Sequence, residues 1–244
     1  MGLLSNLFGG GTPGEKAQRL KAKATQKYGD PATRQKALHQ LSEIKHVDAV
    51  PVLMQRFTFA VDPQTTDAEE KQHCFETICE LGPDAVHHVK DFLTKSDTAS
   101  SWALRILDTI LPPEQVIQIV TAELARLGAN YTRDPEKKEV LIRSLDGKQH
   151  ADVGPALMPF IHDMSDDVKM AALKTVASVK YAPAREEVLK LLVDDETAKR
   201  VQTACVQTLA DAGFEVQGYR EKVEKKLPDG YFVDKAGLVK KRGA

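Results

Sequence analysis

The residues of this sequence that could do chemistry are histidines, clustered acids and cysteines, and their spacing does not favour a catalytic centre. His87 and His88 are neighbours in a helical pattern, so their side chains point about 100° apart and do not face one ion. The acidic runs 166–167 and 194–196 come just before helical patterns, where carboxylates stabilise the positive end of the helix dipole. We therefore expect surface or packing histidines, capping acids, no metal and no cofactor.

Short motifs of common enzymes are also missing. The sequence has no HExxH or zinc-ligand pattern, and the glycine-rich stretch 9–14 lacks the preceding strand and following lysine of a phosphate-binding loop. Cys74, Cys79 and Cys205 form no CxxC pair, which predicts free thiols in a reducing compartment. We expect a protein that is not an enzyme.

The first residues do not have the pattern of a targeting segment. Residues 1–8 lack a basic region, and their apolar stretch is too short for a signal peptide. Asn6 stands where the myristoylation pattern needs Ser or Thr. No run approaches the roughly 18 apolar residues that span a membrane. These features predict a cytoplasmic protein.

Charge is distributed unevenly although the formal net charge is only −1. Residues 1–46 carry 8 Lys and Arg against 3 acids, residues 47–218 carry 18 against 28, and residues 219–244 carry 8 against 4. The long middle is acidic and both ends are basic. This pattern predicts a protein partner with a basic or neutral surface. It argues against binding of nucleic acid, because a protein that binds phosphates needs a basic face.

A repeating pair of apolar residues predicts the elements that must position these side chains. A small or β-branched residue precedes a larger one at Ala37-Leu38, Cys74-Phe75, Ala103-Leu104, Val140-Leu141, Ala172-Leu173 and Cys205-Val206. These anchors recur every 29 to 37 residues, and the two long intervals contain the polar insertions 60–67 and 128–134. Each anchor predicts a first helix, with Leu145 replacing Ser144 in the fourth repeat. A second apolar helix follows each one, after a break with Gly or Pro.

One repeat resembles a known family. The stretch from Asp166 to Leu192 is similar to a HEAT-like repeat of the type found in phycobilin lyases. The matching residues are Asp167, Val168, Lys169, Ala172, Leu173, Pro183, Val188 and Leu192. The resemblance covers about residues 30–227 and is sharp only in this repeat. It implies an all-α protein, a right-handed α-α superhelix (a HEAT-like solenoid) of about six helix pairs.

Three parts of the chain follow from this reading. We expect residues 1–14 to be a flexible segment with an apolar docking peptide, residues 15–227 to form the solenoid, and residues 228–244 to be a C-terminal tail. The lysine-rich stretch 15–28 is expected to be the capping helix. In the tail, 231–233 and 238–240 predict a short β-hairpin or extended arm that packs on the last repeat or adds to a partner.

The function we expect is that of a protein-protein interaction scaffold or adaptor, because HEAT-like second helices line a concave binding face. Helical phase places these residues on that face: Arg56, His87, Lys90, Gln118, Glu123, His162, Arg185 and Lys190. The apolar residues Leu3, Leu4, Leu7 and Phe8 are candidates for docking on a partner or, less expectedly, a membrane. Trp102 is expected to be buried against the neighbouring repeat.

Two alternatives stay open. One is a groove-located ligand carrier or enzyme, similar to a bilin lyase or to a HEAT-like DNA glycosylase. The 6% aromatic content and the acidic middle with a single Trp argue against both versions. The other is a self-assembling or membrane-recruited adaptor that uses the basic ends of the chain.

Overall fold

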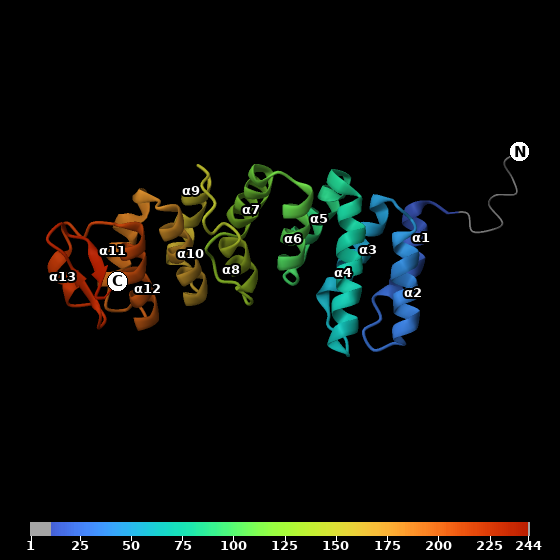
Figure 1. Cartoon of the computed structure of the whole chain (residues 1–244), viewed down its shortest axis with the longest axis horizontal. Coiled ribbons are helices and arrows are strands. Elements are labelled where there is room, and N and C mark those ends of the chain that lie inside the picture. The colour runs from blue at the N-terminus through green and yellow to red at the C-terminus, as the bar shows by residue number, and fades with distance from the viewer. Residues whose placement is uncertain (1–10, 244) are drawn as a thin grey trace, which may run out of the picture. The chain divides into compact units, whose positions relative to one another are not determined.

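A computed structural model describes residues 11–243, so the apolar residues Leu3, Leu4, Leu7 and Phe8 lie outside the described part. The described chain is mostly helical, with thirteen α-helices and one two-stranded sheet (Figure 1). It divides into two compact units, residues 1–116 and 117–244, and each is described by itself. Within residues 11–243, no helix is long and apolar enough to cross a membrane.

The described part of unit 1 contains six complete α-helices, and each packs on helices close to it in the sequence. They are α1 (Pro13–Ala24), α2 (Pro31–Ser42), α3 (Val50–Gln55), α4 (Gln64–Glu80), α5 (Val86–Lys95) and α6 (Ser100–Ile110). The anchor helices α2, α4 and α6 pack side by side in that order, and α3 packs on α5 behind them. Helix α7 (Pro113–Leu127) runs across the boundary between the units.

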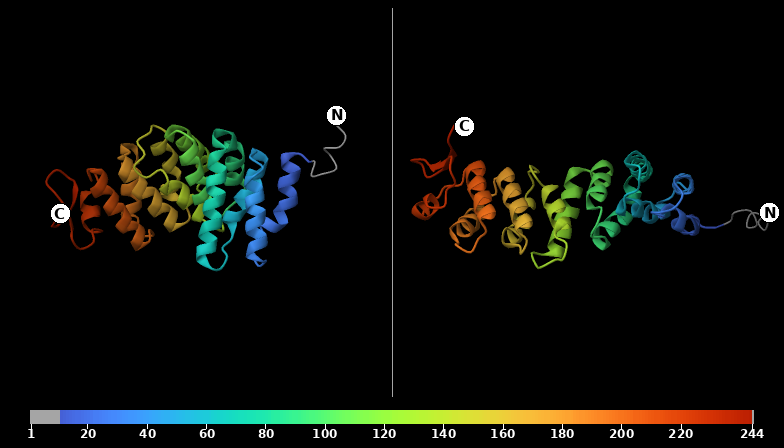
Figure 2. Two further views of the ribbon diagram at one scale, coloured as in Figure 1. Left: turned by 45° about the vertical axis from the view of Figure 1, so that its right-hand side comes forward. Right: turned by 90° about the horizontal axis from the view of Figure 1, so that it is seen from below.

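Unit 2 has a similar internal arrangement of helices and ends in a hairpin. It contains α8 (Glu136–Arg143), α9 (Val153–Leu157), α10 (Asp166–Val179), α11 (Arg185–Val193), α12 (Lys199–Ala212), α13 (Arg220–Glu224), β1 (Tyr231–Val233) and β2 (Val239–Lys241). The anchor helices α8, α10 and α12 lie side by side (Figures 1 and 2). Strands β1 and β2 are antiparallel, Val233 faces Val239, and β2 packs on α12.

The predicted anchors form the core of both units. Ten of the twelve anchor residues are buried, and Leu145 is fully buried in the fourth repeat, where α8 ends before Ser144. The two exceptions are Val140 and Phe75, which are half-buried. Phe75 lies against Trp102, whose indole stacks on Phe57 with ring centroids 4.8 Å apart. Trp102 is thus half-buried between neighbouring helices, and not fully covered as the sequence predicts.

Two helix starts differ from the sequence expectation. Helix α1 begins at Pro13, because Thr12 and Glu15 form a reciprocal capping box, so residues 12–14 belong to the folded chain. Helix α4 begins at Gln64, which places Asp67 in its first turn and not before it. There Asp67 accepts hydrogen bonds from the Val61 amide and from Arg56, and so fixes the insertion 60–67.

The cysteines are free thiols in the described structure. Cys74 and Cys205 are fully buried, and burial raises the pKa of each thiol to about 12. Both are packing residues of the core.

Candidate interaction surface

Arg56 does not lie on an exposed face, which corrects the sequence prediction. Helix α3 ends at Gln55 and the chain continues as a 3₁₀ turn, so the helical phase is lost at this residue. The Arg56 side chain is fully buried. It donates Nε to Glu70 at 2.7 Å, Nη2 to Asp67 at 2.7 Å and Nη1 to the Phe59 carbonyl at 3.0 Å. Its role is internal.

Glu123 is the second correction, since it is also buried. Its carboxylate lies 2.9 Å from Lys137 Nζ and 2.7 Å from Arg126 Nη2. Burial alone would raise the pKa of Glu123, but the hydrogen bonds from Arg126 and Lys137 outweigh it and lower the pKa. Glu123 therefore ties α7 to the neighbouring helix α8 and is covered by that contact.

The other predicted residues on the second helices are not buried, although Arg185 is only 30% exposed, and the structure brings two of them together. Glu187 lies between His162 and Lys190, at 2.9 Å from His162 Nε2 and 3.0 Å from Lys190 Nζ. The hydrogen bonds from Lys190 and then His162 hold the pKa of Glu187 below its usual value. His87 and Lys90 are exposed on α5 and Gln118 on α7, and none of these joins that cluster.

Arg185 is hydrogen-bonded to backbone carbonyls of its own chain. Its guanidinium donates to the carbonyls of Glu215 and Gln217, both at 2.6 Å, and so holds the segment that follows α12. The second helix α11 of unit 2 and the turn after α9 therefore carry polar side chains that are paired within the chain, as at His162, Glu187 and Arg185.

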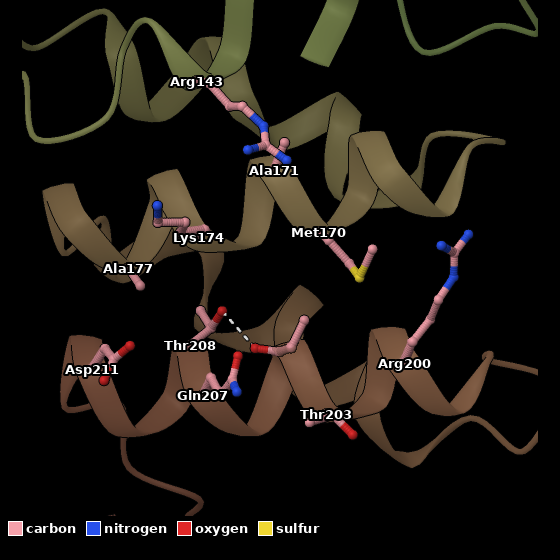
Figure 3. Close-up of a pocket in the computed structure, with 11 residues that line it drawn as sticks. Arg143, Met170, Ala171, Lys174, Ala177, Arg200, Thr203, Gln207, Thr208 and Asp211 are labelled. Carbon is pink, nitrogen blue, oxygen red and sulfur yellow. Dashed lines mark hydrogen bonds between the residues drawn. The ribbon is translucent and has the colours of Figure 1, made fainter. Parts of the chain in front are cut away.

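A groove lies instead along the first helices of unit 2, and helical-phase reasoning missed it (Figure 3). A recess of about 260 Å³ lies between α10 and α12, and one side chain from α8 also lines it. Its lining residues are Arg143, Met170, Ala171, Lys174, Ala177, Arg200, Thr203, Ala204, Gln207, Thr208 and Asp211.

Small side chains form the floor of this groove. Ala171 and Ala177 are buried on α10, and Ala204 is half-buried on α12. Thr208 is 2% exposed, and its hydroxyl can donate to the Leu173 carbonyl at 3.1 Å or the Ala204 carbonyl at 2.9 Å. The first of these bonds would link the two helices beneath the groove and keep the floor closed.

Three cations and one acid stand on the rim. Arg143 pairs with Glu139 on its own helix, Lys174 lies 3.4 Å from Asp146, and Arg200 contacts Asp166 and Asp167 at 3.2 and 2.8 Å. None of these four carboxylates lines the groove. Asp166 and Asp167, which we expected just before α10, lie in its first turn and pair there with Arg200.

A second recess, in unit 1, is lined by Gln35, Leu38, His39, Glu69, Glu70 and His73. The rings of His39 and His73 lie 4.4 Å apart, and burial, followed by the nearby His39, lowers the pKa of His73. Among residues 11–243, no three His, Cys, Asp or Glu side chains are placed to hold a metal ion. The neighbours His87 and His88 likewise meet edge to face, 5.5 Å apart.

Comparison with known proteins adds little to this picture. No protein-family model matches the sequence, and no curated protein matches it either. Among solved structures, human deoxyhypusine hydroxylase in complex with glycerol aligns over 88% of this chain and 94% of its own, at 12% identity and a TM-score of 0.35.

Proposed function

We propose that this chain is a protein-interaction scaffold whose helix pairs stack as HEAT-like solenoid repeats in a right-handed superhelix. The observation that carries the binding role is the groove between α10 and α12, an open recess with a small-residue floor and a charged rim. Such an open recess suits the extended surface of another protein better than a small molecule, which binds in a concave and largely enclosed site.

Two features support binding over catalysis. The cysteines at the anchors have pKa values raised to about 12, so they are poor nucleophiles. Within each unit the buried charges form ion pairs, such as Arg56–Glu70 in unit 1 and Lys138–Asp163 in unit 2, and these pairs serve packing. The free thiols fit a reducing compartment such as the cytoplasm, which is part of the proposal.

The test is site-specific photocrosslinking of the full chain in its native cell extract. A photoreactive phenylalanine analogue replaces exposed Gln207 in the groove, Lys190 on the second-helix surface, or Lys222 on α13 as background. We expect a protein captured at Gln207 that is displaced by excess unlabelled chain. Equal, non-displaceable labelling at all three positions would contradict the scaffold role.

A further inference from the structure

The groove of unit 2 has the length and direction of a helix. Its lining residues on α12 are Arg200, Thr203, Ala204, Gln207, Thr208 and Asp211, which follow the three-or-four spacing of one helical face. At 1.5 Å per residue this row extends over about 16 Å, or three turns. Met170, Lys174 and Ala177 form the matching row on α10 (Figure 3). The recess therefore runs along both helices.

The floor permits close approach of another backbone. Packed helices lie about 8–10 Å apart, and the shorter distance needs small side chains at the contact. Ala171, Ala177 and Ala204 supply them, while half-buried Met170 offers a flexible apolar contact that adapts to different partners. An apolar helix face fits this floor.

The rim favours negative charge in the occupant. The groove lining contains Arg143, Lys174 and Arg200 against the single acid Asp211. These cations are 64%, 74% and 53% exposed, and ion pairs so exposed are worth about 0–1 kcal/mol each. Carboxylates of a partner can therefore replace Glu139 and Asp146 at little cost, and at Arg200 they compete with both Asp166 and Asp167.

We propose that this groove binds an acidic amphipathic helix of a partner protein. Apolar residues of that helix lie on Met170 and the alanine floor, and its Glu or Asp side chains reach Arg143, Lys174 and Arg200. The inference rests on the proposed scaffold function and adds the class and charge of the bound segment. It also differs from the expectation of a partner with a basic or neutral surface, since the acidic total of residues 47–218 does not describe this face.

A pair of synthetic peptides tests the charge of the occupant. The first is a capped 14-residue helix with leucines on one face and glutamates on both sides of them, and the second has lysine at each glutamate. Fluorescence anisotropy with the full chain should show saturable binding of the glutamate peptide and about tenfold weaker binding, or none, of the lysine peptide. Equal binding of both peptides would overturn the proposal.

Variants of the full chain locate the binding. Lys174→Glu reverses an exposed rim charge, and Gln207→Trp fills the recess from an exposed position. Each should weaken glutamate-peptide binding about tenfold. Lys222→Glu, an equal charge change on exposed α13 outside the groove, should leave it within twofold. Loss of binding in Lys222→Glu to the same extent would mean non-specific attraction and would overturn the proposal.

Three further outcomes relate this inference to the scaffold function. A single-stranded oligonucleotide that displaces the glutamate peptide at equal concentration would show a general polyanion site and reject the helix. A partner crosslinked at Lys190 but not at Gln207 would keep the scaffold function and reject this groove. A partner crosslinked at Gln207, competed by the glutamate peptide, would support both.

Discussion

At the scale of single residues, buried polar donors hold the loops between repeats. Arg34, Lys138 and Gln202 are each 5% exposed or less, and each lies in the first half of an anchor helix. Each donates to a carbonyl eight residues earlier in the preceding loop: Arg34 to Gln26 at 3.1 Å, Lys138 to Asn130 at 2.6 Å and Gln202 to Asp194 at 2.9 Å. The repeated spacing indicates a common way of fixing the junctions.

Lys138 is the position at which this role is most readily tested. Replacement of Lys138 by Met leaves Asp163, 2% exposed, without its cation at 2.8 Å. Breaking a buried pair in this way costs about 3–5 kcal/mol, so we expect a loss of that size in the free energy of unfolding, measured by urea titration. The exposed Lys174→Met should change it by less than about 0.5 kcal/mol.

A second substitution distinguishes an uncompensated charge from a lost apolar contact. Asp163→Asn removes the charge but keeps an oxygen for the Ser165 amide, which now donates to Asp163 at 2.9 Å. The double variant Lys138→Met, Asp163→Asn should therefore be more stable than Lys138→Met alone. An equally unstable double variant would contradict the charge argument.

The thiols give a second test at this scale. A pKa of about 12 for Cys74 and Cys205 leaves on the order of one thiolate in ten thousand at pH 8. Ellman's reagent should therefore modify half-buried Cys79 first in the native chain and all three thiols after unfolding in guanidinium. Burial raises the pKa of Cys79 as well, so this reaction should be slow. Early modification of Cys74 or Cys205 would show that the core opens readily.

At the scale of elements, the sequence predicts the anchors and the hairpin because both depend on local patterns. Leu173 and Leu209 are buried as the three-or-four spacing requires, and Val233 and Val239 alternate with outward residues. Arg56 and Glu123 are mispredicted for tertiary reasons. Helix α3 ends one residue before Arg56, and Lys137 covers Glu123 from the next repeat.

The groove is not predicted from the sequence, also because it depends on tertiary packing. Ala171 and Ala204 each precede an anchor pair by one residue, and in the sequence they have the pattern of ordinary small packing residues. Their shared recess depends on how closely α10 and α12 approach, which no local pattern specifies. The outward polar row of Thr203, Gln207 and Asp211 was the available signal, since it marks one uncovered helix face.

The hairpin supplies the prediction at this scale. Val239 is 1% exposed and faces Val233 on the side that packs on α12. Val239→Asn buries an amide without a partner, which costs about 1–3 kcal/mol. Hydrogen exchange should show faster exchange in 231–241 and little change in α10. Lys240→Asn, on the exposed side of the same strand, should leave the protection of 231–241 intact, and equal effects of the two variants would contradict packing on α12.

At the scale of the whole molecule, stability is expected to be local, because most contacts join neighbouring helices of one unit. In a solenoid of the kind proposed, each element is stabilised by its own fold and by its nearest neighbours. Unit 1 has Leu38 and Leu41 in its core, and unit 2 has Leu173 and Leu192, all at most 1% exposed. Neither set of residues is shared between the units.

Matched core substitutions test whether the units respond separately. Leu38→Ala and Leu173→Ala each remove a buried leucine from an equivalent anchor position, at a cost of about 2–5 kcal/mol. Local opening energies set hydrogen exchange, so Leu173→Ala should speed exchange in α10 and α12 far more than in α2 and α4. Leu38→Ala should give the reverse. Equal acceleration throughout the chain by both variants would instead show one cooperative unit, in which a partner bound in the α10–α12 groove would stabilise α2 as strongly as α12.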